Sequence, residues 1–171
     1  LKDIPRVRSH EMLGVIVSDD LKFGQHVSKI LNNSTQSLYA LRVLRTHGMP
    51  QTSLYNVFKA TCLSKLTYAA PAWWGFTLAE ERERFEAFLR KGKKFGYCAP
   101  DYQTFACTVS DLEHNLFKSV IGNPAHLLHA LLPVKRDQHY NLRARPHPFQ
   151  VPLRSTRLTD GNFLIRMLLL S

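Results

Sequence analysis

The spacing of apolar residues changes near the start of the chain, from a short continuous run to a helical repeat. Residues 13–17 form a short apolar run rich in β-branched side chains, which favours a strand. Residues 18–20 supply turn-forming side chains, and residues 21–23 would form a second edge. Between residues 27 and 44, apolar side chains recur every three or four positions. This period predicts one long helix after a β-hairpin.

The remaining pattern predicts more helices, bounded by proline, glycine and capping residues. A second helix would run from Pro50 to Pro71, and a third would begin at Thr77, with Glu80 completing a capping box. Further helices are expected at residues 110–122, 124–133 and 160–170. Between the last two, residues 140–157 carry prolines and arginines with little periodicity, which is typical of an extended segment.

These elements predict a mainly α fold with three parts. A short N-terminal β-hairpin would occupy residues 1–25 and a helical bundle residues 26–133. An extended Pro/Arg-rich segment with a C-terminal helix would complete the chain over residues 134–171. A chain of 171 residues is long enough to bury one core with an appendage.

The charge of the chain points to a polyanionic partner. The formal net charge is +10 and the sequence pI is about 9.8, which favours nucleic acid first and an acidic membrane surface second. No apolar run is close to the length of about 20 residues that a helix needs to span a bilayer. The first residues are charged and include Pro5, which is not typical of a signal peptide. Three cysteines, an odd number, do not indicate a fold held by disulfide bonds, and they fit a reducing compartment. We therefore expect an intracellular protein of the nucleus or cytoplasm, neither secreted nor in a membrane.

Two basic groups are candidate nucleic-acid contacts. Arg90, Lys91, Lys93 and Lys94 form the densest basic run, at the expected end of the third helix. Such a run could follow a phosphate backbone, or simply complement the helix dipole. In the extended segment, residues 143–157 carry further arginines among prolines, and these could contact RNA or lie on the protein surface.

Aromatic and metal-binding residue types give weaker signals. Trp73, Trp74 and Phe76 could stack on bases, although large aromatic side chains between helices are usually core. Cys98 and Cys107 are spaced more widely than zinc ligands usually are. We predict a core role for the aromatic residues and no metal site in this chain.

The adjacent Asp19 and Asp20 raise the question of catalysis. Polymerases hold two metal ions with carboxylates, and an aspartate pair on a turn could supply them. A third carboxylate from an earlier strand would be needed, yet only Asp3 and Glu11 lie upstream, without a strand pattern around them. We therefore interpret Asp19 and Asp20 as turn residues and predict no catalytic residue in this chain.

An ordered series of short motifs resembles one family over nearly the whole chain. The series comprises Leu13-Gly14-Val15, Asp19, Leu21, Phe23, His26 and Ile30, Leu41-Arg42-Val43-Leu44, Leu66-Thr67-Tyr68-Ala69-Ala70-Pro71-Ala72-Trp73, Phe85-Glu86-Ala87-Phe88-Leu89-Arg90-Lys91, Leu132-Pro133-Val134-Lys135-Arg136-Asp137, Tyr140-Asn141-Leu142-Arg143-Ala144-Arg145 and Asn162-Phe163-Leu164-Ile165-Arg166-Met167-Leu168. It resembles the region after the catalytic palm in reverse transcriptases of jockey-like non-LTR retrotransposons.

The resemblance implies a role in holding nucleic acid. Leu13 and Gly14 would belong to the primer grip, and the following helices to a thumb that binds the RNA and DNA of the template–primer. From the charge of the two basic groups, we expect Arg90, Lys91, Lys93 and Lys94 to contact phosphate, and Arg143 and Arg145 to contact RNA. The parent protein would be an RNA-directed DNA polymerase whose Mg²⁺ is held elsewhere, by a palm preceding Leu1 in the same polypeptide.

This chain alone would then be inactive, a C-terminal fragment without the catalytic aspartates and without a cofactor of its own. Two alternatives remain open from the sequence. One is a stand-alone nucleic-acid-binding helical module, and the other is a helical protein-interaction domain whose charge is incidental.

Overall fold

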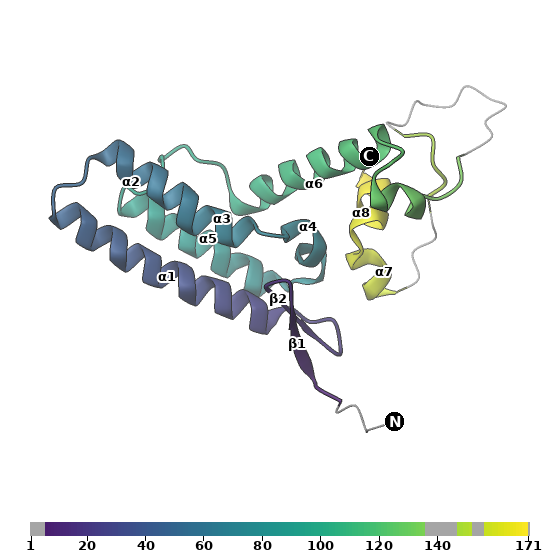
Figure 1. Ribbon diagram of the computed structural model, residues 1–171, viewed down its shortest axis with the longest axis horizontal. Helices are drawn as coiled ribbons and strands as arrows, with labels where there is room; N and C mark the ends of the chain where they lie inside the picture. Colours follow the sequence, from purple (N-terminus) through teal and green to yellow (C-terminus); the bar gives the residue numbers. More distant parts are fainter. Residues whose placement is uncertain (1–5, 136–146, 152–155, 171) are drawn as a thin grey trace.

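The computed structural model describes residues 6–135, 147–151 and 156–170. Within these residues the fold is mainly helical, with a two-stranded antiparallel hairpin at the N-terminal end, as predicted (Figure 1). None of the helices in this described part combines the length and the apolar character needed to cross a bilayer.

The hairpin is shifted by several residues from the predicted position. Strand β1 (Ser9–Met12) pairs with β2 (Val15–Ser18), and Met12 lies opposite Val15. Leu13 and Gly14 therefore form the turn, with φ of 49° and 84°, the pair of positive values found in a type I′ turn. The predicted strand over residues 13–17 and the second edge after it were wrong in this respect, because the partner strand precedes the turn.

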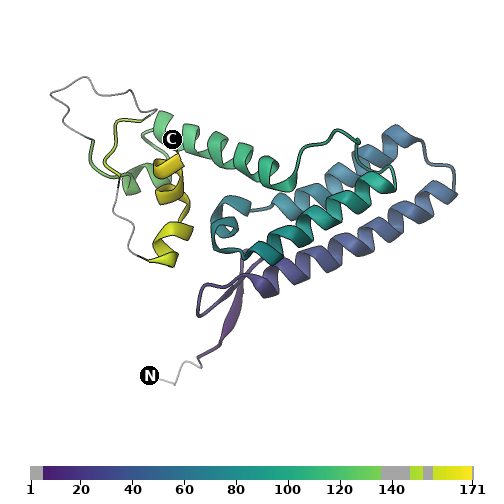
Figure 2. The ribbon, with the colours of Figure 1, turned by 180° about the vertical axis from the view of Figure 1, so that it is seen from behind.

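Three antiparallel helical segments pack beside the hairpin (Figures 1 and 2). Helix α1 (Gly24–Thr46) is the long helix that the period predicted. The second segment is α2 (Gln51–Phe58), which continues through a π-helical turn, η1 (Lys59–Leu63), into α3 (Ser64–Thr67). The third is α5 (Ala79–Lys94). Their apolar faces form one core that includes Val27, Leu41, Phe58 and Phe85.

The aromatic connector between α3 and α5 folds into the core. It forms α4 (Ala70–Trp73) and a short 3-10 turn, η2 (Trp74–Phe76). Trp73 is fully buried and Trp74 nearly so, and both rings pack within 6 Å of Phe85. The predicted core role of these tryptophans is confirmed, since neither ring is accessible for stacking on a base.

Helix α5 begins one residue later than predicted. Leu78 is the N-cap, and its backbone N–H donates to the Glu81 carboxylate at 2.8 Å. The predicted capping box of Thr77 and Glu80 was wrong because the Thr77 hydroxyl donates to the Trp74 carbonyl, at 2.7 Å, and so helps to close η2.

Helix α6 (Phe105–Gly122) begins five residues before its predicted start at Ser110. Its N-cap is Thr104, whose hydroxyl accepts from the Cys107 N–H. The Glu86 carboxylate of α5 accepts from the first two backbone N–H groups, at 3.1 Å each. These contacts satisfy donors that a helix start otherwise leaves open.

A second, smaller core lies around the C-terminal half of α6 (Figure 1). Helices α7 (Arg157–Gly161) and α8 (Phe163–Leu170) pack there, and the segment expected as a fifth helix is instead a 3-10 turn, η3 (Leu127–Leu131). A single predicted helix over residues 160–170 is broken at Asn162, whose side-chain oxygen accepts from two N–H groups of α8. The buried core residues are Phe117, Phe149, Phe163, Met167 and Leu168.

An ion pair fastens α8 to α6. The Arg166 guanidinium donates to both oxygens of the Glu113 carboxylate, at 3.1 and 2.6 Å, and the Arg166 and Glu113 side chains are only 16% and 5% exposed. Gly75 of η2 lies against this arginine, where a Cβ atom would collide with the Gly161 carbonyl and the Arg166 side chain. The close approach explains glycine at position 75.

Candidate nucleic-acid interface

The basic run at the end of α5 does not form one surface, because a helix distributes neighbouring residues around its axis. The exposed Arg90 pairs with Glu83 at 2.7 Å on the solvent side. Lys93 donates to the Tyr102 carbonyl beside α6. Lys94 is exposed, and Lys91 faces α1. Arg90 and Lys93 line a hollow that also contains the Glu83 and Glu86 carboxylates. Lys91 instead lies in a concave surface with Arg42 and Arg45.

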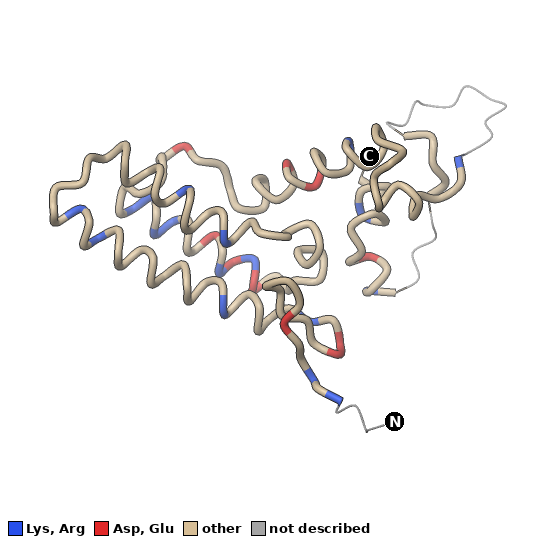
Figure 3. The backbone as a smooth tube through the Cα atoms, in the orientation of Figure 1, with Lys and Arg blue, Asp and Glu red and all other residues tan. Residues whose placement is uncertain are grey.

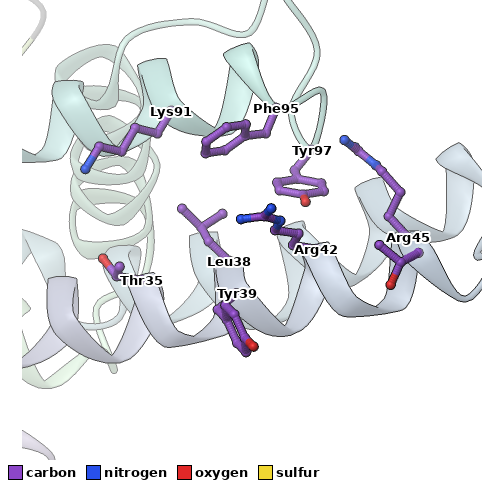
Figure 4. Close-up of a pocket in the computed structure, with 9 residues that line it drawn as sticks. Thr35, Leu38, Tyr39, Arg42, Arg45, Lys91, Phe95 and Tyr97 are labelled. Atoms are coloured by element: carbon purple, nitrogen blue, oxygen red, sulfur yellow. The ribbon is translucent and has the colours of Figure 1, made fainter.

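That concave surface is a groove between α1 and the end of α5, which we call the α1–α5 groove. It has a volume of about 660 Å³. Its basic side chains are Arg42, Arg45 and Lys91, and its aromatic side chains are Tyr39, Phe95 and Tyr97. Figure 4 shows Phe95 pointing from α5 toward Leu38 and Arg42 of α1. In the same view Lys91 extends toward the Thr35 end of the groove, and Tyr39 points away from α5.

One cation of the groove is held in position by an aromatic ring. The Arg45 guanidinium lies 4.3 Å from the centre of the Tyr97 ring, a cation–π contact, and the ring itself is buried. The loop that carries Tyr97 turns at Gly96, where φ is +68°, and the Gln51 side-chain amide donates to the Gly96 carbonyl. Arg45 and the loop that carries Tyr97 are therefore held by contacts within the protein.

The groove carries no compensating negative charge. No carboxylate lines it among the described residues. The sequence has no aspartate or glutamate between Leu21 and Ala79, so all of α1 and the second helical segment carry only positive charge (Figure 3). Among the described residues, neither Arg42 nor Lys91 forms an ion pair. Their charges are thus available to an anion.

Sequence reasoning missed Arg42 and Arg45. The sequence did contain a signal. Residues 35, 39, 42 and 46 follow the helical period, so they lie on one side of α1, at the edge of its apolar face. The sequence could not show that the end of α5 packs opposite this side of α1.

The predicted primer-grip residues lie at the tip of the hairpin. Leu13 is 86% exposed, and its carbonyl accepts from the Tyr68 hydroxyl at 3.1 Å. Gly14 lies beside the same ring. A shallow hollow of about 240 Å³ separates this tip from α1 and α3, and Lys29 and Lys65 lie at its edge. Lys29 is paired with Glu11 of β1 at 2.7 Å.

A buried histidine joins the hairpin to α1. His26 is 1% exposed, its Nδ1 atom accepts from the Ile16 N–H at 3.4 Å, and its ring packs edge-on against Trp73. Burial lowers the pKa of His26, and the nearby Lys29 ammonium lowers it further. The imidazole is therefore held neutral, as accepting this hydrogen bond requires.

The hairpin tip and the α1–α5 groove lie on opposite flanks of α1. Asn33 lines the hollow under the tip, and Arg42 lines the groove. They are nine positions apart, which is about two and a half turns of helix and so half a turn around the axis. A ligand bound in the groove is therefore separated from a ligand bound at the hairpin tip by at least the thickness of the helix, about 10 Å.

Asp19 and Asp20 lie after β2, where the chain turns into α1. The Asp20 carboxylate accepts from the Ser18 hydroxyl at 2.7 Å and pairs with Lys22 at 2.6 Å. Hydrogen bonds from Lys22 and then Ser18 lower the pKa of Asp20 to about 2. Both aspartates are turn residues, although the turn follows the hairpin instead of closing it. Among the described residues, no group of three or more histidine, cysteine or acidic side chains could hold a metal ion.

The other predicted RNA contacts, Arg143 and Arg145, lie outside the described residues. The chain matches no protein-family model, no curated protein and no solved structure.

Proposed function

We propose that this chain is the primer-grip and thumb region of a jockey-like retrotransposon reverse transcriptase, and that it holds template–primer nucleic acid. The α1–α5 groove is the observation that carries the nucleic-acid part of this proposal. The sequence resemblance supplies the more specific part. A stand-alone nucleic-acid-binding module would use the same groove, whereas an interaction domain with incidental charge would not need it.

The chemistry of the groove suits a phosphate backbone. Arg42, Arg45 and Lys91 provide fork-like and point-like donors, and no carboxylate among the described residues competes for them. Contacts of this kind are independent of base sequence and release condensed counterions. We assign this chain no step of phosphoryl transfer. In the proposal, that step belongs to the palm of the parent polymerase.

Leu13 supports a contact at the hairpin tip. Its φ of +49° is a left-handed conformation that costs a leucine about 1–2 kcal/mol, and its side chain is 86% exposed. Asparagine is the residue that this turn position favours. Local stability therefore does not explain the leucine, and strain of this kind often accompanies a binding role. We propose that the Leu13 side chain packs against the primer strand.

Replacing Leu13 with asparagine should stabilise the protein and weaken its hold on nucleic acid. The free energy of unfolding should rise by about 0.5–1 kcal/mol, since asparagine tolerates the left-handed turn. Leu21→Asn is a matched control, because Leu21 also has a positive φ, of 52°, but lies outside the hairpin turn. Thermal unfolding and binding to an RNA/DNA hybrid would be measured for both. If the two variants bind the hybrid alike, Leu13 has no primer contact.

A salt series tests nucleic-acid binding itself. The intact chain would be titrated against a fluorescein-labelled RNA/DNA hybrid by fluorescence anisotropy. Three phosphate contacts give a logarithmic salt slope of about −2.7, so raising salt from about 50 to about 200 mM should weaken binding about 40-fold. Absence of binding at low salt, or an affinity that does not change with salt, would contradict the proposal.

A further inference from the structure

We infer that the α1–α5 groove takes an unpaired nucleic-acid strand, with a base stacked on the Phe95 ring and phosphates beside Lys91 and Arg42. This inference rests on the proposed function and names the form of nucleic acid that enters one of its two contact surfaces. It is carried by an exposed ring, the cations around it and the position of the groove on α1.

Phe95 is the exception among the phenylalanines of the third helical segment. Phe85 and Phe88 are buried in the core, with 0% and 4% exposure, whereas Phe95, at the C-cap of α5, is 48% exposed. Its ring lies tilted beside Tyr97, with 6.1 Å between the ring centres. Almost half of a large apolar side chain thus faces the solvent at the edge of a groove, where it does not contribute to the main core.

Cations flank this ring on both sides of the groove. Lys91 precedes Phe95 by about one helical turn on α5, so their side chains share a face. Arg42 reaches toward the same space from α1 (Figure 4). An aromatic ring between cations is the arrangement with which proteins bind single strands, since stacking holds the base and the cations hold the adjacent phosphates.

An unpaired strand fits this arrangement better than a duplex. Within a duplex each base is covered on both faces by its neighbours, so a side-chain ring has no free face to stack on. An unstacked strand offers a π-face at every base, which makes the contact tolerant of sequence. The groove volume of about 660 Å³ lies within the about 300–1,000 Å³ usual for small-molecule sites, so a base with its sugar is of a suitable size.

The position of the groove supports a second, separate strand contact. The hairpin tip, where the primer would lie, is on the opposite flank of α1. A duplex held at the tip therefore leaves the groove open to another segment of nucleic acid. The exposed ring also favours a nucleic acid over an acidic peptide, whose carboxylates would use the cations but not the ring.

The test compares a single strand with a duplex. Fluorescein-labelled oligo(dT) and a blunt duplex, each about 12 nucleotides long, would be titrated by anisotropy against the full chain and two variants. Phe95→Leu should weaken binding of the single strand about 5- to 150-fold, the range for loss of one stacked base, and leave duplex binding unchanged. Tyr55→Leu is the control, because Tyr55 is a partly exposed ring of α2 that does not line the groove.

A second readout reports stacking directly. A strand carrying 2-aminopurine should lose fluorescence on binding the unaltered chain, and lose less on binding Phe95→Leu. Equal effects of Phe95→Leu on single strand and duplex, or no effect on either, would overturn the inference and leave the proposed function standing. Tighter binding of an oligo-glutamate peptide than of oligo(dT) would also overturn it. Failure of the unaltered chain to bind either nucleic acid would instead contradict the proposed function.

Discussion

Replacing Phe85 with alanine is expected to lower the free energy of unfolding by about 4 kcal/mol, the largest effect of any substitution considered for this chain. The Phe85 ring is fully buried and lies parallel to Phe105, with 4.5 Å between the ring centres. It also packs within 6 Å of Trp73 and Trp74. Truncation removes contacts with α4, η2 and α6 together, and leaves a cavity where they meet.

Chemical denaturation followed by tryptophan fluorescence would measure this loss. Because a domain of this size is typically stable by about 5–15 kcal/mol, Phe85→Ala should remain largely folded at low temperature but melt far earlier. Tyr39→Ala is the control, since Tyr39 is 70% exposed and its loss should change stability by less than about 0.5 kcal/mol. Similar effects of the two substitutions would show that the aromatic cluster is not the centre of the core.

Replacing Arg166 with methionine should cost about 3 kcal/mol, because it leaves the Glu113 carboxylate buried without its partner. Glu113 is 4% exposed and accepts two hydrogen bonds from Arg166. The loss should loosen α7 and α8 from α6 and leave the three-segment core intact, since the two cores have no described residue in common.

A double-mutant cycle separates the ion pair from the packing of Arg166. Glu113→Gln combined with Arg166→Met removes both charges, and should recover about half of the stability that Arg166→Met loses. Hydrogen exchange should show faster exchange in α8 and unchanged protection in α1. If the single and double variants are equally unstable, the carboxylate is not the cause of the loss.

The long helices could be predicted from the sequence because their apolar period is local information. The hairpin could not be placed correctly, because Leu13 is an apolar residue next to a β-branched run and so was assigned to the strand, whereas its backbone has a left-handed turn conformation. Its partner strand, Ser9–Met12, is mostly polar and exposed, so it gave no strand signal. The start of α6 was missed because part of its cap comes from Glu86, on another helix.

In the candidate site, too, local patterns could be predicted from the sequence and tertiary contacts could not. The basic run of α5 was visible in the sequence, but only Lys91 faces α1. Arg42 and Arg45 gained their significance from the packing of α1 against the end of α5, which no local pattern encodes. Leu13 and Gly14 were singled out through resemblance, and their exposure at the hairpin tip is a tertiary fact.

The central claim is that nucleic acid binds in the α1–α5 groove and not simply to a chain with net charge +10. The most direct test compares two variants that carry the same change in charge at different places. One variant carries Arg42→Glu and Lys91→Glu in the groove, and the other carries Lys59→Glu and Lys118→Glu on exposed positions of η1 and α6. Both lower the net charge equally.

Anisotropy titrations at one low salt concentration would compare the two variants with the unaltered chain, after circular dichroism has shown that all three are folded. We predict that the groove variant binds oligo(dT) at least about 30-fold more weakly, and that the other variant stays within about threefold. Equal losses in the two variants would contradict the claim, because binding would then follow net charge and not the groove.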